Sequence, residues 1–243
     1  MSVGVLLAID STGSMKWVHK ELCKNIGSII QQFDDEGVPA RFSLIGFRDY
    51  QSSPTNWIEM MDFETAEEEE GLLAEWLSNL VAKGGGNNQA ESSMAGLAYG
   101  ITEFEWPEVK RRVVAIFTDD FAHIPDYNID SWNEVHEILR DHNIQQVHLF
   151  VDERHEEGYD ELDSAEYDVI RHPLVKNDRA GLEQSIRKFV KVSSSGFGGD
   201  VEIIERDISD NPFDFEDVRP RDSSETVDDK GDWDPDANPF DGW

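Results

Sequence analysis

Residues 3–9, Val-Gly-Val-Leu-Leu-Ala-Ile, form an apolar run with no polar residue at alternate positions. A strand with one face in water alternates apolar and polar side chains, so this run predicts a strand that is buried on both faces. Such strands occur mainly in parallel sheets with helices on both sides. The run is too short to span a membrane and lacks the basic flank and cleavage site of a signal peptide, so we expect a cytoplasmic protein.

The chain up to residue 192 continues as an alternation of strand-like runs and helical stripes. Further strands are predicted at 41–47, 57–61 (an edge strand), 112–118, 146–151 and 168–170. Helical stripes lie between them, at 15–33, 72–80, 90–101, 131–142 and 182–190. Ser14 stands where a serine commonly caps a following helix. This order predicts an α/β fold of the doubly wound kind, with a mostly parallel sheet and helices on both of its faces.

The composition changes at residues 193–199, Ser-Ser-Ser-Gly-Phe-Gly-Gly, which are typical of a flexible linker. Residues 193–243 contain 16 acidic and 4 basic residues and show no helical period. We therefore predict one domain at 1–192 and an acidic, disordered tail at 193–243. The tail contains Asn-Pro-Phe-Asp twice, at 211–214 and 238–241. The repeat indicates a short docking motif, with chance repetition of a turn sequence as the alternative.

The net charge of −31, from 52 acidic and 21 basic residues, limits the classes of partner. A surface with this charge repels phosphate backbones and anionic membranes, so we expect neither nucleic acid nor a membrane as a partner. Cations and basic protein surfaces suit it better. Cys23 is the single cysteine, so no disulfide can form within the chain, and its place in a helical stripe predicts a buried apolar role.

Three predicted loops carry oxygen-bearing side chains. Asp10–Ser14 follows the first strand, Gly84–Asn88 precedes a helix, and Thr118–Asp120 ends the strand at 112–118. Because sites in open α/β sheets form at the carboxyl ends of the strands, we expect these loops to meet there. Each loop alone is an ordinary turn sequence. Three of them at matching positions predict a common site.

Asp10-x-Thr12-x-Ser14, the glycine loop and the Thr118-Asp119 strand end together resemble the metal-ion-dependent adhesion site of von Willebrand factor A (vWA) domains, over roughly residues 3–192. The resemblance implies that Thr12 and Ser14 bind a divalent metal through their hydroxyls. It implies that Asp10 and Asp119 bind the metal either directly or through a water molecule. Asn87 stands where the family often has Thr or Asp, and Asn88 is the alternative ligand. Mg²⁺ is the expected metal, because it favours six oxygens, with Mn²⁺ or Ca²⁺ as alternatives.

Two flanking segments are similar to a cytosolic branch of vWA proteins that is common in bacteria. These are Phe47–Tyr50, and the residues from Thr118 to His123. In that branch a similar Arg-Asp pair and a similar histidine border the metal site. The resemblance therefore implies that Arg48, Asp49 and His123 lie at the border of the metal site. The alternative is a surface ion pair between Arg48 and Asp49 and an ordinary loop histidine.

These features predict a metal-dependent adaptor rather than an enzyme. Two neutral hydroxyls and two carboxylates leave Mg²⁺ under-neutralised, so an open position would attract an acidic side chain of a partner protein. The resemblance suggests a relation to AAA+ ATPases or to multi-gene stress and defence systems.

One alternative is a scaffold with a degenerate metal site whose tail docks a basic partner; another is a metal-dependent hydrolase. A haloacid-dehalogenase-type phosphatase needs an Asp where Thr12 stands. The tail is either a docking arm or a self-inhibitor of the metal site.

Overall fold

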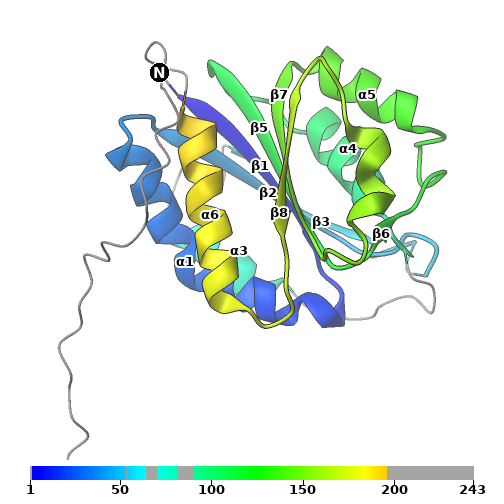
Figure 1. Cartoon of the computed structure of the whole chain (residues 1–243), viewed down its shortest axis with the longest axis horizontal. Coiled ribbons are helices and arrows are strands. Elements are labelled where there is room, and N and C mark those ends of the chain that lie inside the picture. Colours follow the sequence, from blue (N-terminus) through cyan, green and yellow to red (C-terminus); the bar gives the residue numbers. More distant parts are fainter. Residues whose placement is uncertain (1, 53, 64–69, 81–89, 196–243) are drawn as a thin grey trace, which may run out of the picture. The chain divides into compact units, whose positions relative to one another are not determined.

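The structure is a computed structural model that describes residues 2–52, 54–63, 70–80 and 90–195, all within one compact unit, Met1–Val201. Its main sheet has the strand order β3-β2-β1-β5-β7-β8 (Figure 1). The strands are β1 (Val3–Asp10), β2 (Ala40–Phe47), β3 (Ile58–Met61), β5 (Arg111–Thr118), β7 (Ile144–Val151) and β8 (Asp168–Pro173). Neighbouring strands run parallel except for β3, which pairs antiparallel to β2 at the edge. The predicted α/β fold with a mostly parallel sheet is confirmed.

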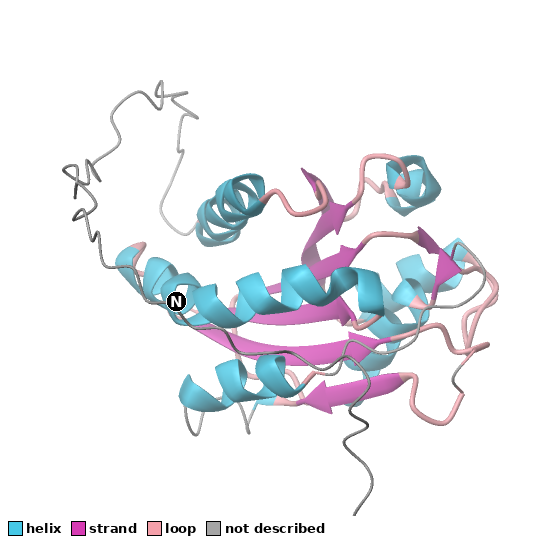
Figure 2. Cartoon of the chain, turned by 90° about the horizontal axis from the view of Figure 1, so that it is seen from below, coloured by secondary structure: helices cyan, strands magenta, loops and turns pink. Residues whose placement is uncertain are grey.

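Helices cover both faces of this sheet (Figures 1 and 2). One face carries α1 (Lys16–Asp35), α3 (Glu70–Asn79) and α6 (Arg179–Ser194), and the other carries α4 (Ser93–Glu103) and α5 (Trp132–Asp141). The short elements are η1 (Gly13–Met15), β4 (Ala90–Glu91), β6 (Phe121–Ala122) and η2 (Glu156–Leu162). None of the described helices is long and apolar enough to cross a membrane.

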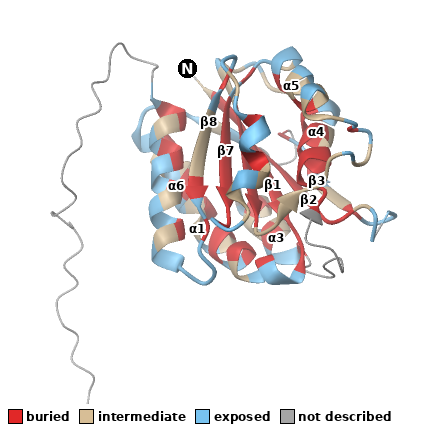
Figure 3. Cartoon of the chain, turned by 45° about the vertical axis from the view of Figure 1, so that its right-hand side comes forward, coloured by how far each residue is buried: buried red, intermediate tan, exposed pale blue. Residues whose placement is uncertain are grey.

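The burial of strand β1 on both faces explains why its sequence does not alternate between apolar and polar residues. All eight of its residues are buried, and Figure 3 shows that burial is concentrated in the central strands. Val5 and Leu7 pack into the core beneath α1, α3 and α6, whereas Leu6 and Ala8 pack into the core beneath α4 and α5. Each large apolar side chain buried in this way contributes about 1.5–3 kcal/mol to folding. The strand therefore holds both helical layers together.

A glycine brings α4 close to the sheet. A Cβ at Gly96 would lie 2.8 Å from the Cβ of Phe47 on β2, which is closer than side chains approach one another. The absence of a side chain at Gly96 lets the start of α4 sit directly over the end of β2. This places the β4–α4 segment at the carboxyl edge of the sheet, where the candidate site lies.

The structure extends two predicted elements and adds one small sheet. β7 begins at Ile144, two residues before the predicted start, and β8 continues to Pro173. The parallel pair β4–β6 was not predicted, because two-residue strands carry no periodic pattern.

Helix α6 also ends later than the sequence predicts. Ser193 and Ser194, which the sequence places in the linker, form the last turn of α6, and both are buried. A run of three serines favours a linker by composition alone, but here the Ser194 hydroxyl donates back to the Val190 carbonyl within the helix. Residues 196–243, with both Asn-Pro-Phe-Asp motifs, lie outside the described residues, so the predicted division into 1–192 and 193–243 stays a prediction.

Candidate metal centre

The loops after β1 and β5 lie side by side at the carboxyl edge of the sheet. The two strands pair in parallel, and Ile9 stands opposite Phe117. The residues that follow, in the loops 10–14 and 118–120, therefore leave the sheet at the same edge. Two of the three loops predicted to share a site are thus brought together by the pairing of two central strands.

A continuous chain of hydrogen bonds joins these two loops. The Asp10 carboxylate accepts the Thr12 N–H at 2.8 Å and the Thr118 hydroxyl at 3.1 Å. The Thr12 and Ser14 hydroxyls share a hydrogen bond of 3.1 Å, and the Ser14 hydroxyl donates to Asp119 Oδ1 at 3.0 Å. The structure therefore brings together Asp10, Thr12, Ser14 and Asp119, four of the five side chains predicted from sequence. The fifth, Asn87, and its alternative Asn88 lie outside the described residues.

Ser14 does not cap α1, so the capping prediction was wrong. Ser14 lies inside η1, and the residue before the first turn of α1 is Met15, which makes no side-chain capping bond. Its hydroxyl instead reaches across to Asp119 on the other loop. A local sequence pattern favours the cap, but the parallel pairing of β1 and β5 places a charged acceptor, the Asp119 carboxylate, where the Ser14 hydroxyl donates to it.

The neighbouring hydroxyl, Ser11, points the other way. Its backbone N–H and its hydroxyl both donate to the Phe47 carbonyl at the end of β2, at 2.8 and 2.9 Å. Ser11 therefore anchors the loop to the sheet, whereas Thr12 and Ser14 point toward Asp10 and Asp119. The same loop thus holds one structural hydroxyl and two hydroxyls that face the carboxylates.

The cluster is buried at one end and open at the other. Asp10 and Thr118 are fully buried and Thr12 is 2% exposed, whereas Ser14 is exposed and Asp119 is half-buried. The side chains that reach solvent are thus one hydroxyl and one carboxylate. A cation could enter from this side while the buried carboxylate of Asp10 stays behind it.

Burial makes the charge on Asp10 costly. The pKa of Asp10 is raised to about 7, chiefly by burial of the side chain and to a smaller extent by the nearby Asp119 carboxylate, while hydrogen bonds from Thr12 and Thr118 act in the opposite direction. The hydrogen bonds therefore do not compensate fully for the loss of water. A divalent cation would supply the missing positive charge.

Glu91 of β4 is a buried carboxylate that the sequence analysis missed. It is 3% exposed, and its Oε2 has no hydrogen-bond partner among the described residues. Burial, followed by the charges of Asp10, Asp49 and Asp120, raises the pKa of Glu91 to about 9. No sequence pattern pointed to this role, because Glu91 stands in a stretch that is predicted as the first turn of a helix. The structure adds it as a second buried acid behind the loops.

Tyr159 of η2 is the other unpredicted member of the site. Its hydroxyl donates to the Asp120 carbonyl at 2.9 Å and shares a hydrogen bond of 3.0 Å with Ser93 at the start of α4. The side chain is fully buried. Tyr159 therefore fixes the backbone of the loop after β5 against α4. No local pattern could reveal this role, since its partners lie 39 and 66 residues away.

The side chains of Arg48 and Asp49 are both buried, so the alternative prediction of an ion pair on the surface does not hold. The guanidinium of Arg48 donates to Glu59 Oε1 at 2.6 Å and to the Asn56 carbonyl at 2.8 Å. Asp49 accepts the N–H of Gln51 and closes a tight turn. Asp49 also lies near enough to Glu91 to raise its pKa. The pair thus borders the site through Asp49, while Arg48 ties β2 to β3.

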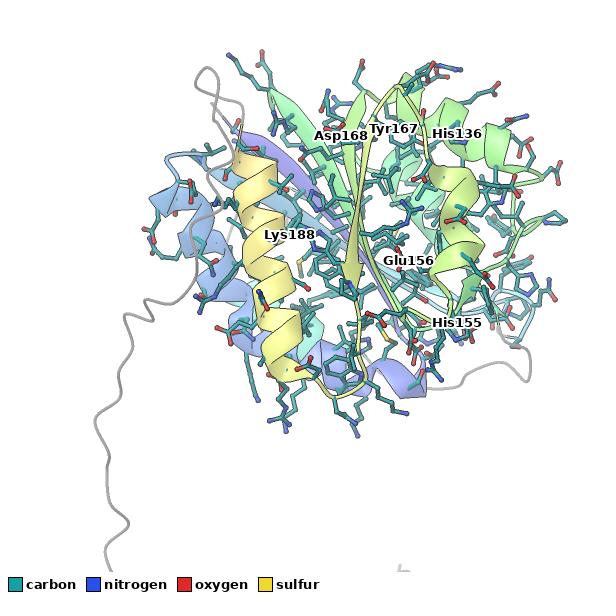
Figure 4. All side chains as sticks on the ribbon, viewed as in Figure 1. His136, His155, Glu156, Tyr167, Asp168 and Lys188 are labelled. Atoms are coloured by element: carbon teal, nitrogen blue, oxygen red, sulfur yellow. The ribbon has the colours of Figure 1, made fainter. Side chains whose placement is uncertain are left out.

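Two histidines stand beside the second loop. The His123 N–H donates to the Glu91 carbonyl at 3.0 Å, so the backbone of His123 joins the small β4–β6 sheet to the site. His155, which Figure 4 labels, precedes η2. Its ring contacts the ring of Phe121, with 4.4 Å between the centroids. Burial raises the pKa of Asp120, and the nearby His155 acts in the opposite direction.

The donor set fits a hard cation. Among the described residues no group of three or more His, Cys, Asp and Glu is placed to hold a metal. The cluster instead offers two hydroxyls and two carboxylates, from Thr12, Ser14, Asp10 and Asp119. Cations such as Mg²⁺, Mn²⁺ and Ca²⁺ take oxygen ligands of these kinds, whereas sites for softer metals use sulfur and imidazole.

Solved structures show the same fold. The chain is similar to proximal thread matrix protein 1 (PTMP1) from the mussel byssus, described with a zinc-occupied MIDAS motif, at a TM-score of 0.57 and 12% identity, covering 79% of this chain and 46% of that one. It is also similar to the open conformation of the pilus adhesin SpaC from Lactobacillus rhamnosus GG, at a TM-score of 0.53 and 12% identity, covering 79% and 30%. A second form of SpaC gives 0.54 and 13%, covering 81% and 31%.

These likenesses concern the fold, because the identities are low. The chain spans less than half the length of each of these structures. No family model and no curated protein matches the sequence. The strand order, the two helical layers and these neighbours together show that this chain has a vWA-like fold.

Proposed function

We propose that this protein binds a divalent cation, Mg²⁺ by preference, at the carboxyl edge of its sheet and uses it to bind a carboxylate of a partner protein. The observation that carries the proposal is the hydrogen-bonded chain from Asp10 through Thr12 and Ser14 to Asp119. It joins two separate loops through the hydrogen bond from the Ser14 hydroxyl to Asp119, and it opens to solvent at these two residues.

The charges of the cluster support a cation with a free position. Asp10 and Glu91 are both buried carboxylates whose ionisation is disfavoured by burial and by neighbouring acids. A divalent cation favours the ionised form of such carboxylates. Mg²⁺ also keeps part of its coordination shell for water or for an incoming ligand. A partner carboxylate is the ligand that suits this position.

The neighbours support a binding function as well. PTMP1 is described with a metal-occupied MIDAS motif, and SpaC is a pilus adhesin. The metal in PTMP1 is zinc, so Mg²⁺, Mn²⁺, Ca²⁺ and Zn²⁺ all belong in the test. We propose a cytoplasmic adaptor rather than an adhesin, on the basis of the single cysteine and of the flanking Arg48-Asp49 and His123 positions.

We propose binding rather than catalysis. Thr12 occupies the position where a haloacid-dehalogenase-type phosphatase would need its acidic proton donor. Tyr159 is committed to hydrogen bonds with Ser93 and Asp120, and burial raises its pKa above the usual range. It therefore serves to fix the loops rather than to exchange protons.

The test is affinity capture with the full chain in Mg²⁺ and in chelator, read by mass spectrometry, beside the variant Asp119→Ala. The proposal expects one set of proteins that is retained in Mg²⁺ and lost both in chelator and with the variant. If the same proteins are retained in chelator and with Asp119→Ala, the result would favour a scaffold that acts through the tail. Turnover in a phosphatase and nuclease screen that disappears with Asp119→Ala would favour a hydrolase.

A further inference from the structure

A groove of about 490 Å³ lies between the first half of α1 and the end of α3. Its walls and floor come from Lys16, His19, Lys20, Cys23, Lys24, Leu77, Ser78 and Leu80. The helices α1 and α3 pack on the same face of the sheet, as Figures 1 and 3 show. We call this feature the lysine groove.

The charge of the lysine groove is opposite to that of the whole chain. Lys16, Lys20 and Lys24 are all exposed, and no Asp or Glu is among the described residues that line the groove. The chain carries 52 acidic and only 21 basic residues. Three lysines on one side of one helix, without an acidic neighbour in the lining, favour an anionic ligand. The floor adds apolar contacts from Cys23, Leu77 and Leu80.

The spacing of the lysines selects one shape of ligand. Lys16, Lys20 and Lys24 are four residues apart, which is about 6 Å along a helix. Alternate residues of an extended peptide are about 6.6 Å apart. An extended segment with an acid at every second position can thus place one carboxylate near each lysine. The residues between would face the floor of the groove or the solvent.

The groove begins next to the candidate metal centre. Lys16 is the first residue of α1 and lies two positions after Ser14, whose hydroxyl bonds to Asp119. A partner segment that gives one carboxylate to the metal can therefore continue directly along α1. This continuity links the groove to the same binding event.

We propose that the lysine groove is the second half of the partner-binding surface and receives an extended acidic segment with carboxylates at alternate positions. The inference rests on the proposed function for its link to the metal. It commits to one ligand chemistry, an acidic peptide of a partner protein with apolar residues between its carboxylates.

Lys20 lies at the centre of this surface. Lys24 already pairs with Glu21 at 3.2 Å, and Glu21 pairs also with Arg179 at 3.2 Å, so a ligand must compete for Lys24. Lys20 has no ion-pair partner among the described residues. Substitution of Lys20 is therefore expected to have a larger effect than substitution of Lys24.

The test uses two labelled synthetic peptides of identical composition, with fluorescence anisotropy and the full chain. In one peptide aspartate alternates with leucine, and in the other the aspartates are contiguous. The alternating peptide is expected to bind more tightly. Lys20→Glu should weaken its binding about fivefold, which is the upper end of what an exposed ion pair contributes.

Lys188→Glu is the matched control, because Lys188 is an exposed lysine of α6 outside the groove lining (Figure 4). Both variants change the net charge equally, so a long-range effect of charge would weaken binding in both. The inference expects a loss of less than about twofold with Lys188→Glu. Equal losses, or equal binding of the two peptides, would overturn it.

The same titrations in Mg²⁺ and in chelator separate this inference from the proposed function. If binding is insensitive to the metal but Lys20→Glu still acts selectively, the metal proposal fails and the groove stands. If binding requires Mg²⁺ but the two lysine variants behave alike, the groove fails and the metal proposal stands.

Discussion

Among the described residues, a metal cluster and a histidine cluster each join polar side chains from separate parts of the chain, and they differ in burial and in charge. The metal cluster is the group of Asp10, Thr12, Ser14 and Asp119 at the carboxyl edge of the sheet. The histidine cluster is formed by His148 of β7, His172 of β8 and Ser193 of α6. His148 and His172 share a hydrogen bond of 2.9 Å, and Ser193 bonds to the other ring nitrogen of His148 at 3.2 Å.

The histidine cluster is closed and neutral. His148 is fully buried and His172 is 1% exposed, and the His172 ring stacks on Phe150 at 4.3 Å. Burial lowers the pKa of His148 to about 2 and that of His172 to about 3; His172 adds to the effect on His148, and Lys188 to that on both. Both ring nitrogens of His148 and Nε2 of His172 are hydrogen-bonded within the fold, whereas Nδ1 of His172 has no partner among the described residues. The metal cluster instead keeps excess negative charge and an open side, which is the arrangement of a ligand site rather than of a structural joint.

The largest effect is expected from Asp10→Asn. The amide keeps the shape of the side chain and can still accept the Thr12 N–H, but it removes the charge behind the cation. Metal affinity should fall at least about 100-fold, because the lost charge lies in a buried, poorly screened position. The metal-free variant should be as stable as the wild type or more stable, since a costly buried carboxylate is gone. Calorimetry and thermal unfolding in chelator measure the two effects.

A lower melting temperature for Asp10→Asn in chelator would contradict this comparison. It would mean that Asp10 stabilises the fold by its own hydrogen bonds, as the histidine cluster does. The metal cluster would then be a second structural joint.

The histidine cluster predicts a loss of stability in acid. Its folded pKa values lie below the ordinary value near 6.5, so the unfolded chain binds more protons as the pH falls below 6.5. Stability is therefore complete above about 6.5 and decreases as the pH falls toward the folded pKa values. Between pH 7 and pH 5.5 the pair should cost about 2.5 kcal/mol of unfolding free energy. Urea unfolding at both pH values measures this change.

The matched variants are the double substitution His148→Gln with His172→Gln, and the single substitution His142→Gln at the end of α5. The double variant should lose most of this pH dependence, whatever its stability at pH 7. His142→Gln should keep it. If all three proteins lose stability equally in acid, the histidine cluster is not the cause.

A smaller change, in the free energy of unfolding, is expected when the chain is shortened at the end of α6. A chain that ends at Val192 lacks the Ser193 hydroxyl that bonds to His148, and it also lacks the Ser193 and Ser195 carbonyls that accept from Arg111 at 3.0 and 2.6 Å. Residues 1–195 should therefore fold alone and be more stable than residues 1–192 by about 1–2 kcal/mol. Circular dichroism during urea unfolding compares them. Equal stabilities would place Ser193 outside the cooperative unit.

The sequence predicted the central part of the fold well, because fully buried strands leave a clear pattern. Val3–Asp10 is apolar up to its last residue, and it became the strand that separates the two helical layers. Loops at the ends of β1 and β5 could be placed for the same reason. The cap at Ser14 was wrong, because a short local pattern cannot show an acceptor 105 residues away.

The parts of the site that were missed depend on long-range packing. Glu91 lies in a two-residue strand with no periodicity, and its burial follows from the pairing of β4 with β6. Tyr159 acts through partners from α4 and from the loop after β5. His148 and His172 stand in separate strands whose pairing is known only from the register of β7 and β8.

The central claim is that the hydroxyls of the first loop hold a divalent cation, and direct metal titration tests it. Mg²⁺ and Mn²⁺ binding to the full chain are measured by calorimetry for Thr12→Val and Ser11→Ala. Both variants remove one buried hydroxyl from the same loop, but only Thr12 faces Ser14 and the carboxylates, whereas Ser11 bonds to the Phe47 carbonyl. The account predicts saturable binding that Thr12→Val weakens about tenfold or more and Ser11→Ala leaves nearly unchanged. Absence of saturable binding in the wild type, or equal losses in the two variants, would contradict it.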